Sequence, residues 1–322
     1  MRFVIYGAGG IGGTIGARLF QHGHDVLLIA RGAHLAAIKE RGLRFVSATI
    51  DERLPIPAVA HPREANLDEY DVVILCMKSQ HTESALRDLI QSSPSNTPVV
   101  CCQNGVANER MALRRFANVY GMVVLLPAEH LEPGEVVNFA EDSAGVLDAG
   151  RYPNSVDVMI GEVTAALNNS GFSAIADPNI MRQKYAKLLN NLNNAVQAAC
   201  GEGSADIAKQ LRDEALACYA AAGIDCASSE ETRGRRRGIR GTSVPGFTRN
   251  GGSSMQSVMR GTGDIEADYL NGEIVQLGRL HGIQTPANGV VQQVGNRMAR
   301  ERLDVGAYTL DDLESLIQSE TH

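Results

Sequence analysis

A chain of 322 residues, 44% of them hydrophobic, is long enough to form two domains with separate cores, which excludes a small scaffold held by disulfides. Thirty Lys and Arg residues against 37 Asp and Glu residues give a net charge of −7, which excludes a globally basic surface for nucleic acid or anionic lipid. The 33 Gly residues exceed the roughly 23 that average usage gives for this length. The composition therefore indicates an α/β protein that meets small molecules and needs close backbone approaches.

The cysteines and the N-terminus indicate a cellular compartment. None of the six cysteines forms a CxxC pair, and Cys76, Cys101 and Cys102 lie inside apolar runs typical of buried, reduced thiols. Arg2 is followed by only four apolar residues before Gly7, too few for a signal peptide, and no run reaches the roughly 18 residues of a membrane span. We expect a soluble, cytoplasmic protein.

The first thirty residues predict a strand, a glycine turn, a helix and a second strand. The strands are expected at residues 3–6 and 26–30, and the helix ends near Gly23. The turn consists of Gly7, Ala8, Gly9, Gly10, Ile11 and Gly12. This order is typical of a dinucleotide-binding βαβ unit, so we expect these six residues to bind a cofactor pyrophosphate.

Each glycine of the GxGxxG pattern has a separate expected role. Gly7 permits the tight turn, Gly9 lets the pyrophosphate approach the backbone, and Gly12 lets the helix pack closely on the strand. The helix N-terminus then faces the phosphates.

The end of the second strand predicts which dinucleotide binds. An NAD enzyme usually presents Asp or Glu to the ribose 2′-hydroxyl there, but this chain has Arg31. A guanidinium cannot accept a hydrogen bond from the hydroxyl, whereas it pairs well with a 2′-phosphate. We therefore predict NADP(H), with a solvated loop arginine as the alternative.

Two further apolar runs predict parallel strands that are covered on both faces. The run at residues 71–77 ends on Lys78, and the run at 98–103 ends on Asn104. Ligands of an open parallel sheet bind beyond the carboxyl ends of its strands. Lys78 and Asn104 are therefore candidate cofactor-binding residues, with a surface lysine and a turn asparagine as the alternatives.

The second half of the chain predicts mainly helices. A further strand is expected at residues 119–126, and short strands and turns at 134–160 close the first domain. The expected helices span residues 181–200, 205–223, 254–260, 266–281 and 287–302. With a linker near 172–178, we predict a cofactor domain at 1–175 and a helical domain at 176–322.

A lysine and two asparagines share one face of the first of these helices. Lys187, Asn191 and Asn194 follow an i, i+4, i+7 spacing, next to a stripe of apolar residues. A lysine at the edge of apolar surface is partly desolvated, which makes it a better proton donor to a carbonyl near neutral pH. The alternative is an ordinary solvated polar face.

Residues 233–240 contain five arginines in eight positions. Such a stretch can grip a phosphate or a larger anion, but we expect a solvated loop.

An ordered set of motifs extends over nearly the whole chain. The set comprises Gly7-Ala8-Gly9-Gly10-Ile11-Gly12, Arg31-Gly32 with His34-Leu35, Gly42-Leu43, Lys78, Gln103-Asn104-Gly105, Tyr185-Ala186-Lys187-Leu188 with Asn191, Ser253-Ser254-Met255 and Glu266-Ala267-Asp268-Tyr269-Leu270-Asn271-Gly272. With these residues the chain resembles the ketopantoate reductase (2-dehydropantoate 2-reductase) family. The resemblance implies an α/β Rossmann domain followed by an all-α domain like that of 6-phosphogluconate dehydrogenase, with a substrate cleft between them.

The resemblance also implies a reaction, NADPH-dependent reduction of 2-dehydropantoate to pantoate in pantothenate biosynthesis. Lys187 would be the general acid, Asn104 and Ser254 would hold the substrate carboxylate, Asn191 a polar oxygen, and Glu266 the substrate hydroxyl. No metal site is implied. The expected partner is a small-molecule 2-oxo acid, with a homodimer as a further option and no nucleic acid or membrane.

Two departures from the family pattern leave the substrate open. Ala195 stands where the pattern has a second substrate asparagine, with Asn194 one position earlier, and Ser257-Val258 replaces a Gln-Asp pair. The alternatives are the same fold acting on a different 2-oxo acid or ketone, and a non-catalytic NADPH-binding sensor.

Overall fold

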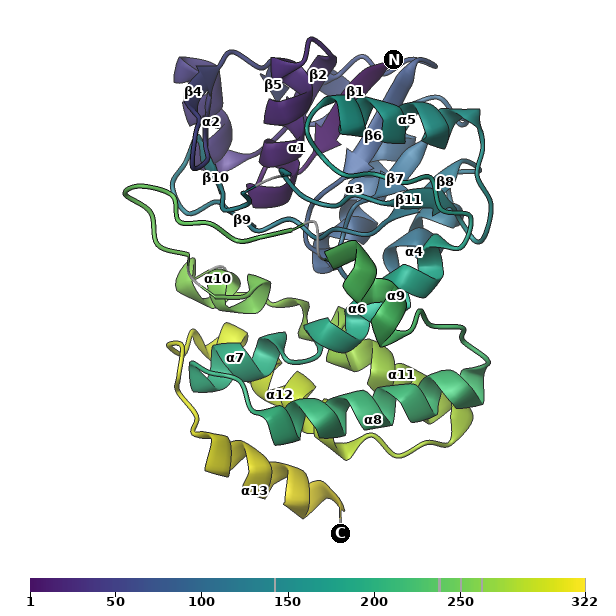
Figure 1. The fold of residues 1–322 in the computed structure, drawn as a ribbon, viewed down its shortest axis with the longest axis vertical. Helices are drawn as coiled ribbons and strands as arrows, with labels where there is room; N and C mark the ends of the chain where they lie inside the picture. The colour runs from purple at the N-terminus through teal and green to yellow at the C-terminus, as the bar shows by residue number, and fades with distance from the viewer. Residues whose placement is uncertain (142, 237–238, 250, 262, 322) are drawn as a thin grey trace. The chain divides into compact units, whose positions relative to one another are not determined.

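The computed structural model describes residues 1–141, 143–236, 239–249, 251–261 and 263–321 (Figure 1). The chain forms two compact units, each assembled from separate stretches. The first unit contains residues 1–103, 108–184 and 229–249. The second unit contains residues 104–107, 185–228 and the described residues after 250.

The first unit is built on a seven-stranded sheet whose neighbouring strands are parallel, except that β11 runs antiparallel to β8. The order across the sheet is β11 (Ala149–Arg151), β8 (Val119–Met122), β7 (Val99–Cys101), β6 (Asp71–Leu75), β1 (Arg2–Tyr6), β2 (Asp25–Ile29) and β5 (Ala58–Val59). The apolar runs predicted as strands therefore lie side by side, as expected for a Rossmann sheet.

Helices cover both faces of this sheet because alternate strand residues point to opposite sides. On one face, Ile5 and Ile74 join an apolar cluster with α1 (Gly10–Gln21) and α5 (Val158–Asn169). On the other face, Val4 and Val73 pack with α3 (Thr82–Ile90) and α4 (Asn108–Leu113). The predicted α/β fold of the N-terminal half is confirmed.

Helix α1 also packs against a second, four-stranded sheet. This sheet has the order β4 (Asp51–Leu54), β3 (Leu43–Val46), β10 (Glu135–Asn138) and β9 (Ala128–Glu129). A Cβ on Gly16 would lie 2.8 Å from Leu28 Cδ2 of β2, and one on Gly13 would lie 2.6 Å from Val136 Cγ1 of β10. Small residues therefore let one helix approach both sheets.

The remaining elements of the first unit are short. They are α2 (Gly32–Arg41), η1 (Pro62–Glu64), η2 (Ser79–His81), the first part of α6 (Ile180–Asn191) and α9 (Ser229–Arg236).

The second unit is helical, as predicted. Its elements are the end of α6, α7 (Asn194–Cys200), α8 (Ala205–Ala222), α10 (Ser253–Met259), η3 (Glu266–Tyr269), α11 (Asn271–His281), α12 (Pro286–Glu301) and α13 (Leu310–Thr321) (Figure 1). Two predicted helices are interrupted, one between Asn191 and Asn194 and the other at Leu270. At the first interruption the Leu192 carbonyl accepts a hydrogen bond of 3.0 Å from Asn271 Nδ2, which satisfies a group that a continuous helix would pair.

The arginine-rich stretch corrects the expectation of a solvated loop. Residues up to Arg236 belong to α9, and Arg235 makes a bidentate contact of 2.8 and 2.5 Å with the buried carboxylate of Asp148. Beyond it, Gly241 bridges to Ala140. Arg237 and Gly238 lie outside the described residues. This stretch is part of the first unit although its sequence neighbours are helices of the second.

Candidate functional site

The glycine loop between β1 and α1 has the geometry that its three expected roles require. Gly7 has φ +103°, and a Cβ there would lie 2.8 Å from Met77 N. A Cβ on Gly12 would overlap the Gly7 carbonyl oxygen and lie 2.8 Å from Ile5 Cγ2. At Gly9 a Cβ would meet no atom of the described residues within 4 Å. The loop is therefore closed on the protein side and open at Gly9, where a pyrophosphate can approach the N-terminus of α1.

His34 of α2 holds the glycine loop in place. Its Nε2 lies 2.8 Å from the Ala8 carbonyl oxygen, and its Nδ1 accepts a hydrogen bond of 2.8 Å from Gly134 N–H. These contacts fix the neutral Nε2–H tautomer. Burial and, to a lesser extent, repulsion by His130, whose ring centre is 4.0 Å away, lower the pKa of His34 to about 4. The sequence contains His34 within a motif but does not reveal this contact.

Arg31 follows β2, at the carboxyl end of the strand, and its side chain is exposed. Its Nη2 lies 3.5 Å from Nε2 of His81, the last residue of η2. Lys78 immediately precedes η2. The predicted cofactor residues Arg31 and Lys78 therefore both border this 3-10 turn.

A buried polar network anchors the loop that carries Lys78. Gln103 Nε2 donates to the Met77 carbonyl at 3.0 Å and to Thr82 Oγ1 at 2.7 Å. Thr82 Oγ1 donates to Asn108 Oδ1 at 2.8 Å, and Asn108 Nδ2 donates to Ser79 Oγ at 3.1 Å. Because Met77 and Ser79 flank Lys78, the network fixes the main chain on both sides of the lysine.

Lys187 and Asn104 meet in the second unit. Lys187 Nζ donates to Asn104 Oδ1 at 2.6 Å, across 83 residues of sequence. Asn191 lies one turn further along α6, and its Oδ1 is buried with no hydrogen-bond partner among the described residues. A buried acceptor of this kind is typical of a ligand-binding position. Asn194 starts α7, so the helical spacing from Lys187 extends to Asn191 only.

The remaining substrate candidates also belong to the second unit. Ser254 and Glu266 are buried, and Ser253 Oγ lies 3.5 Å from Glu266 Oε2. A Cβ on Gly252 would lie 3.6 Å from Asn194 Oδ1, which places Asn194 beside the segment that leads to Ser254.

The departure at Ala195 has a structural explanation. Ala195 is buried, and a Cβ built on Gly295 of α12 would lie 3.3 Å from the Ala195 Cβ. A side chain at position 195 therefore points into helix packing, where an asparagine would not fit without moving α12.

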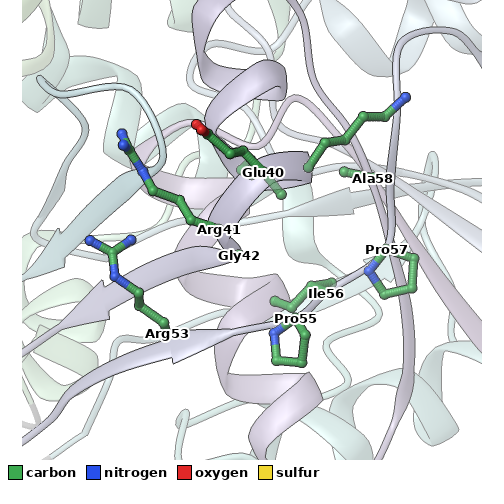
Figure 2. A pocket seen from close by; sticks show the side chains of 10 residues that line it. Glu40, Arg41, Gly42, Arg53, Pro55, Ile56, Pro57 and Ala58 are labelled. Carbon is green, nitrogen blue, oxygen red and sulfur yellow. The ribbon is translucent and has the colours of Figure 1, made fainter.

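A separate cavity of about 540 Å³ lies at the C-terminal end of α2 (Figure 2). It is lined by residues 38–42 and by residues 53, 55, 56, 57 and 58. None of the predicted site residues lines it. Arg41 and Arg53, both labelled in Figure 2, are among the residues that line it.

Three findings bear on the remaining sequence predictions. All six cysteines have free thiols. Within the described part of the chain, no helix has the length and apolar character to cross a membrane. The same residues include no group of three or more His, Cys, Asp or Glu that could hold a metal ion.

Comparison with known proteins identifies relatives of both halves. Residues 3–153 match the family described as ketopantoate reductase PanE/ApbA, and residues 179–299 match the C-terminal domain of the same family. A 2-dehydropantoate 2-reductase of Pyrococcus horikoshii is 28% identical over 310 residues, covering 89% of this chain and 94% of the relative.

Solved structures show the same fold. A PanE/ApbA family ketopantoate reductase from Ralstonia eutropha superposes with a TM-score of 0.78 at 26% identity, covering 94% of this chain and 99% of that one. A D-mandelate dehydrogenase, solved with NADH and anilino(oxo)acetate, gives a TM-score of 0.80 at 23% identity with the same coverage.

Proposed function

The chain belongs to the ketopantoate reductase PanE/ApbA family, and from this premise we propose that it reduces 2-dehydropantoate to pantoate with NADPH, using Lys187 as the general acid. It is an oxidoreductase that acts on CH–OH groups, and the activity it shares with its relatives is reduction of a 2-oxo acid with a nicotinamide cofactor. The observation that carries the finer proposal is the 2.6 Å hydrogen bond between Lys187 Nζ and Asn104 Oδ1.

The Lys187–Asn104 pair fits the chemistry of carbonyl reduction. When bound, the nicotinamide supplies a hydride, and the carbonyl oxygen then needs a proton. Asn104 Oδ1 accepts from the Lys187 ammonium and so fixes its direction, while the Nδ2 group of the same amide can donate to a substrate carboxylate. Lys187 delivers the proton, and Ser254 provides a second donor to the carboxylate.

The first unit supplies the residues that fit NADPH. Gly9 is open to a pyrophosphate, α1 offers its N-terminal N–H groups, and its first turn contains no acidic residue to repel phosphate. Arg31 is exposed at the end of β2, where its guanidinium can pair with a 2′-phosphate. These features support NADPH over NADH, and Lys78 adds a second cation to the cofactor residues.

Replacing Lys187 tests the proposed general acid. Because general acid catalysis contributes about 10²- to 10⁴-fold, we expect Lys187→Ala to lower kcat on 2-dehydropantoate at least about 100-fold. Its Kd for NADPH, measured by fluorescence titration, should stay within about twofold of wild type. Lys209→Ala, at an exposed lysine of α8 paired with Asp213, is the control and should keep full activity. A Lys187→Ala enzyme within tenfold of wild-type kcat would overturn the role of Lys187.

The buried Ala195 favours a second candidate, the same reaction on a different branched 2-oxo acid. NADPH oxidation over a panel of 2-oxo acids, including an analogue of 2-dehydropantoate without the hydroxyl, separates the candidates. If Glu266 hydrogen-bonds to the substrate hydroxyl, the analogue should have a lower kcat/KM than 2-dehydropantoate. Glu266→Gln should then remove the difference in kcat/KM between the two substrates. NADPH binding without NADPH oxidation on any substrate of the panel would instead indicate a sensor.

A further inference from the structure

Helix α6 carries a second lysine, Lys184, one turn before Lys187. Unlike Lys187, it is buried with 3% of its surface exposed. Its Nζ donates to the Cys101 carbonyl at 3.2 Å and to the Gln103 carbonyl at 3.1 Å, and it lies 2.5 Å from Oε1 of Glu109. Glu109, on α4, is completely buried.

This pair is poorly explained by stability alone. Burying two charges costs free energy that their attraction repays only with good geometry and further hydrogen bonds. The Lys184–Glu109 contact is close but not a well-aligned hydrogen bond, and Glu109 Oε2 has no donor among the described residues. Two apolar side chains of similar volume would fill the same space without the free-energy cost of burying charges. They could not, however, donate hydrogen bonds to the two main-chain carbonyls.

Those two carbonyls belong to the short segment that leads from the end of β7 to Asn104. Cys101 is the last residue of β7, and Gln103 immediately precedes Asn104. Lys184 therefore holds the main chain up to position 103, and Lys187 holds the side chain at position 104. Positions i and i+3 lie on the same face of a helix. Two lysines from one face of α6 thus hold consecutive residues of a single turn.

We propose that Lys184 and Glu109 form a positioning pair that sets the distance and direction between Asn104 and Lys187. This role rests on the proposed function of Lys187 as the general acid. Lys184 is too buried to reach a substrate, so it acts through the main chain of Cys101 and Gln103. Glu109 lies against the buried ammonium and offsets its charge, so that Lys184 can hold the two carbonyls.

The test removes both charges together, because removing one leaves the other buried without its partner. In Lys184→Met/Glu109→Gln we expect a lower kcat by about tenfold or more, since a misplacement of about 1 Å can cost about 100-fold. The KM for NADPH should remain within about twofold. The solvent deuterium isotope effect on kcat should rise, because a displaced ammonium makes proton transfer more rate-limiting. A purely structural pair would not move this isotope effect.

A matched control is available at the other end of the sheet. Arg2 and Asp71 form a bidentate pair of 2.7 and 2.6 Å at the amino ends of β1 and β6, and Asp71 is 1% exposed. Arg2→Met/Asp71→Asn should change the melting temperature but leave kcat and the isotope effect as in wild type.

The outcomes separate this proposal from the proposed function. A folded Lys184→Met/Glu109→Gln enzyme with wild-type kcat and isotope effect overturns the positioning role while leaving Lys187 untouched. Near wild-type kcat in Lys187→Ala overturns the proposed function instead. If the double variant does not fold, Lys184→Gln/Glu109→Gln replaces it, because two amides keep a hydrogen bond but shorten the reach to the carbonyls. Failure of both forms to fold would assign the pair a structural role and also overturn the proposal.

Discussion

The glycine loop of the first unit and helix α6, whose residues from Tyr185 onward belong to the second unit, are built in different ways. The loop acts through its main chain, and its glycines matter because they lack side chains: Gly12 sits against Ile5, and Gly9 faces open space. The helix acts through long side chains whose partners lie about 80 residues away, as in the 2.6 Å bond from Lys187 to Asn104. A local pattern can specify the first kind of site, whereas the second depends on how distant segments pack.

The largest expected effect comes from adding a side chain to the glycine loop, where the structure leaves no room for one at Gly12. Gly12→Ala should lower the free energy of unfolding by about 2–3 kcal/mol, because the new methyl overlaps the Gly7 carbonyl oxygen in a packed interior. Gly9→Ala is the matched control, since its φ of −69° suits alanine and its Cβ meets nothing within 4 Å. It should stay within about 1 kcal/mol of wild type in urea unfolding but bind NADPH at least about tenfold more weakly. Equal stability of the two variants would contradict the comparison.

A smaller effect is expected at Arg31, a proposed cofactor contact that depends on a side chain. Arg31→Ala should raise the KM for NADPH by about tenfold, the loss expected for one charge-assisted hydrogen bond, and leave the KM for NADH unchanged. Arg41→Ala, at an exposed arginine at the end of α2, should change neither. Steady-state kinetics with both cofactors measures the effect. An unchanged ratio of the two KM values would remove the argument for NADPH.

The smallest effect concerns the histidine that ties α2 to the glycine loop. His34 has its pKa lowered from 6.5 to about 4, so the unfolded chain takes up a proton before the folded protein does. Its contribution to stability is present above pH 6.5 and is lost as the pH falls toward 4. With an allowance for its partial exposure, we expect a loss of about 1 kcal/mol between pH 7 and pH 5.5.

The His34→Gln variant isolates this contribution. The amide can keep one hydrogen bond but does not titrate, so urea unfolding should depend less on pH over this range. His22→Gln, at an exposed histidine beyond α1, should keep the wild-type dependence. If both variants retain the same slope, His34 does not titrate in this way.

Much of the first unit could be predicted because its signals are local. Short apolar runs bounded by Gly7, Lys78 and Asn104 specify strands that are buried on both faces, and parallel order then places their carboxyl ends together. The second unit could be predicted as helical, but not where its helices are interrupted. The interruption after Asn191 depends on Asn271, which satisfies the Leu192 carbonyl from 79 residues away.

The Lys184–Glu109 pair shows why the rest could not be predicted. In the sequence, Lys184 is one more polar residue on an amphipathic helix, and Glu109 one more acidic residue at a helix start. Their burial follows from the packing of α6 and α4 near the end of β7, which no periodicity encodes. Arg235 is a similar case, because a run of arginines predicts exposure whereas Asp148 places this one in an ion pair.

The position of the segment 229–249 in the sequence affects how the first unit folds during synthesis. During synthesis, the first unit lacks this segment until roughly 65 residues after position 184 have been added, which takes about 3 to 13 s. Until then, Asp148 is buried without its arginine, and the apolar cluster of Val46, Val137 and Phe139 lacks Val244. A nascent chain therefore cannot complete its first unit before part of the second has been made, and a chain that ends near residue 175 would lack part of the first unit.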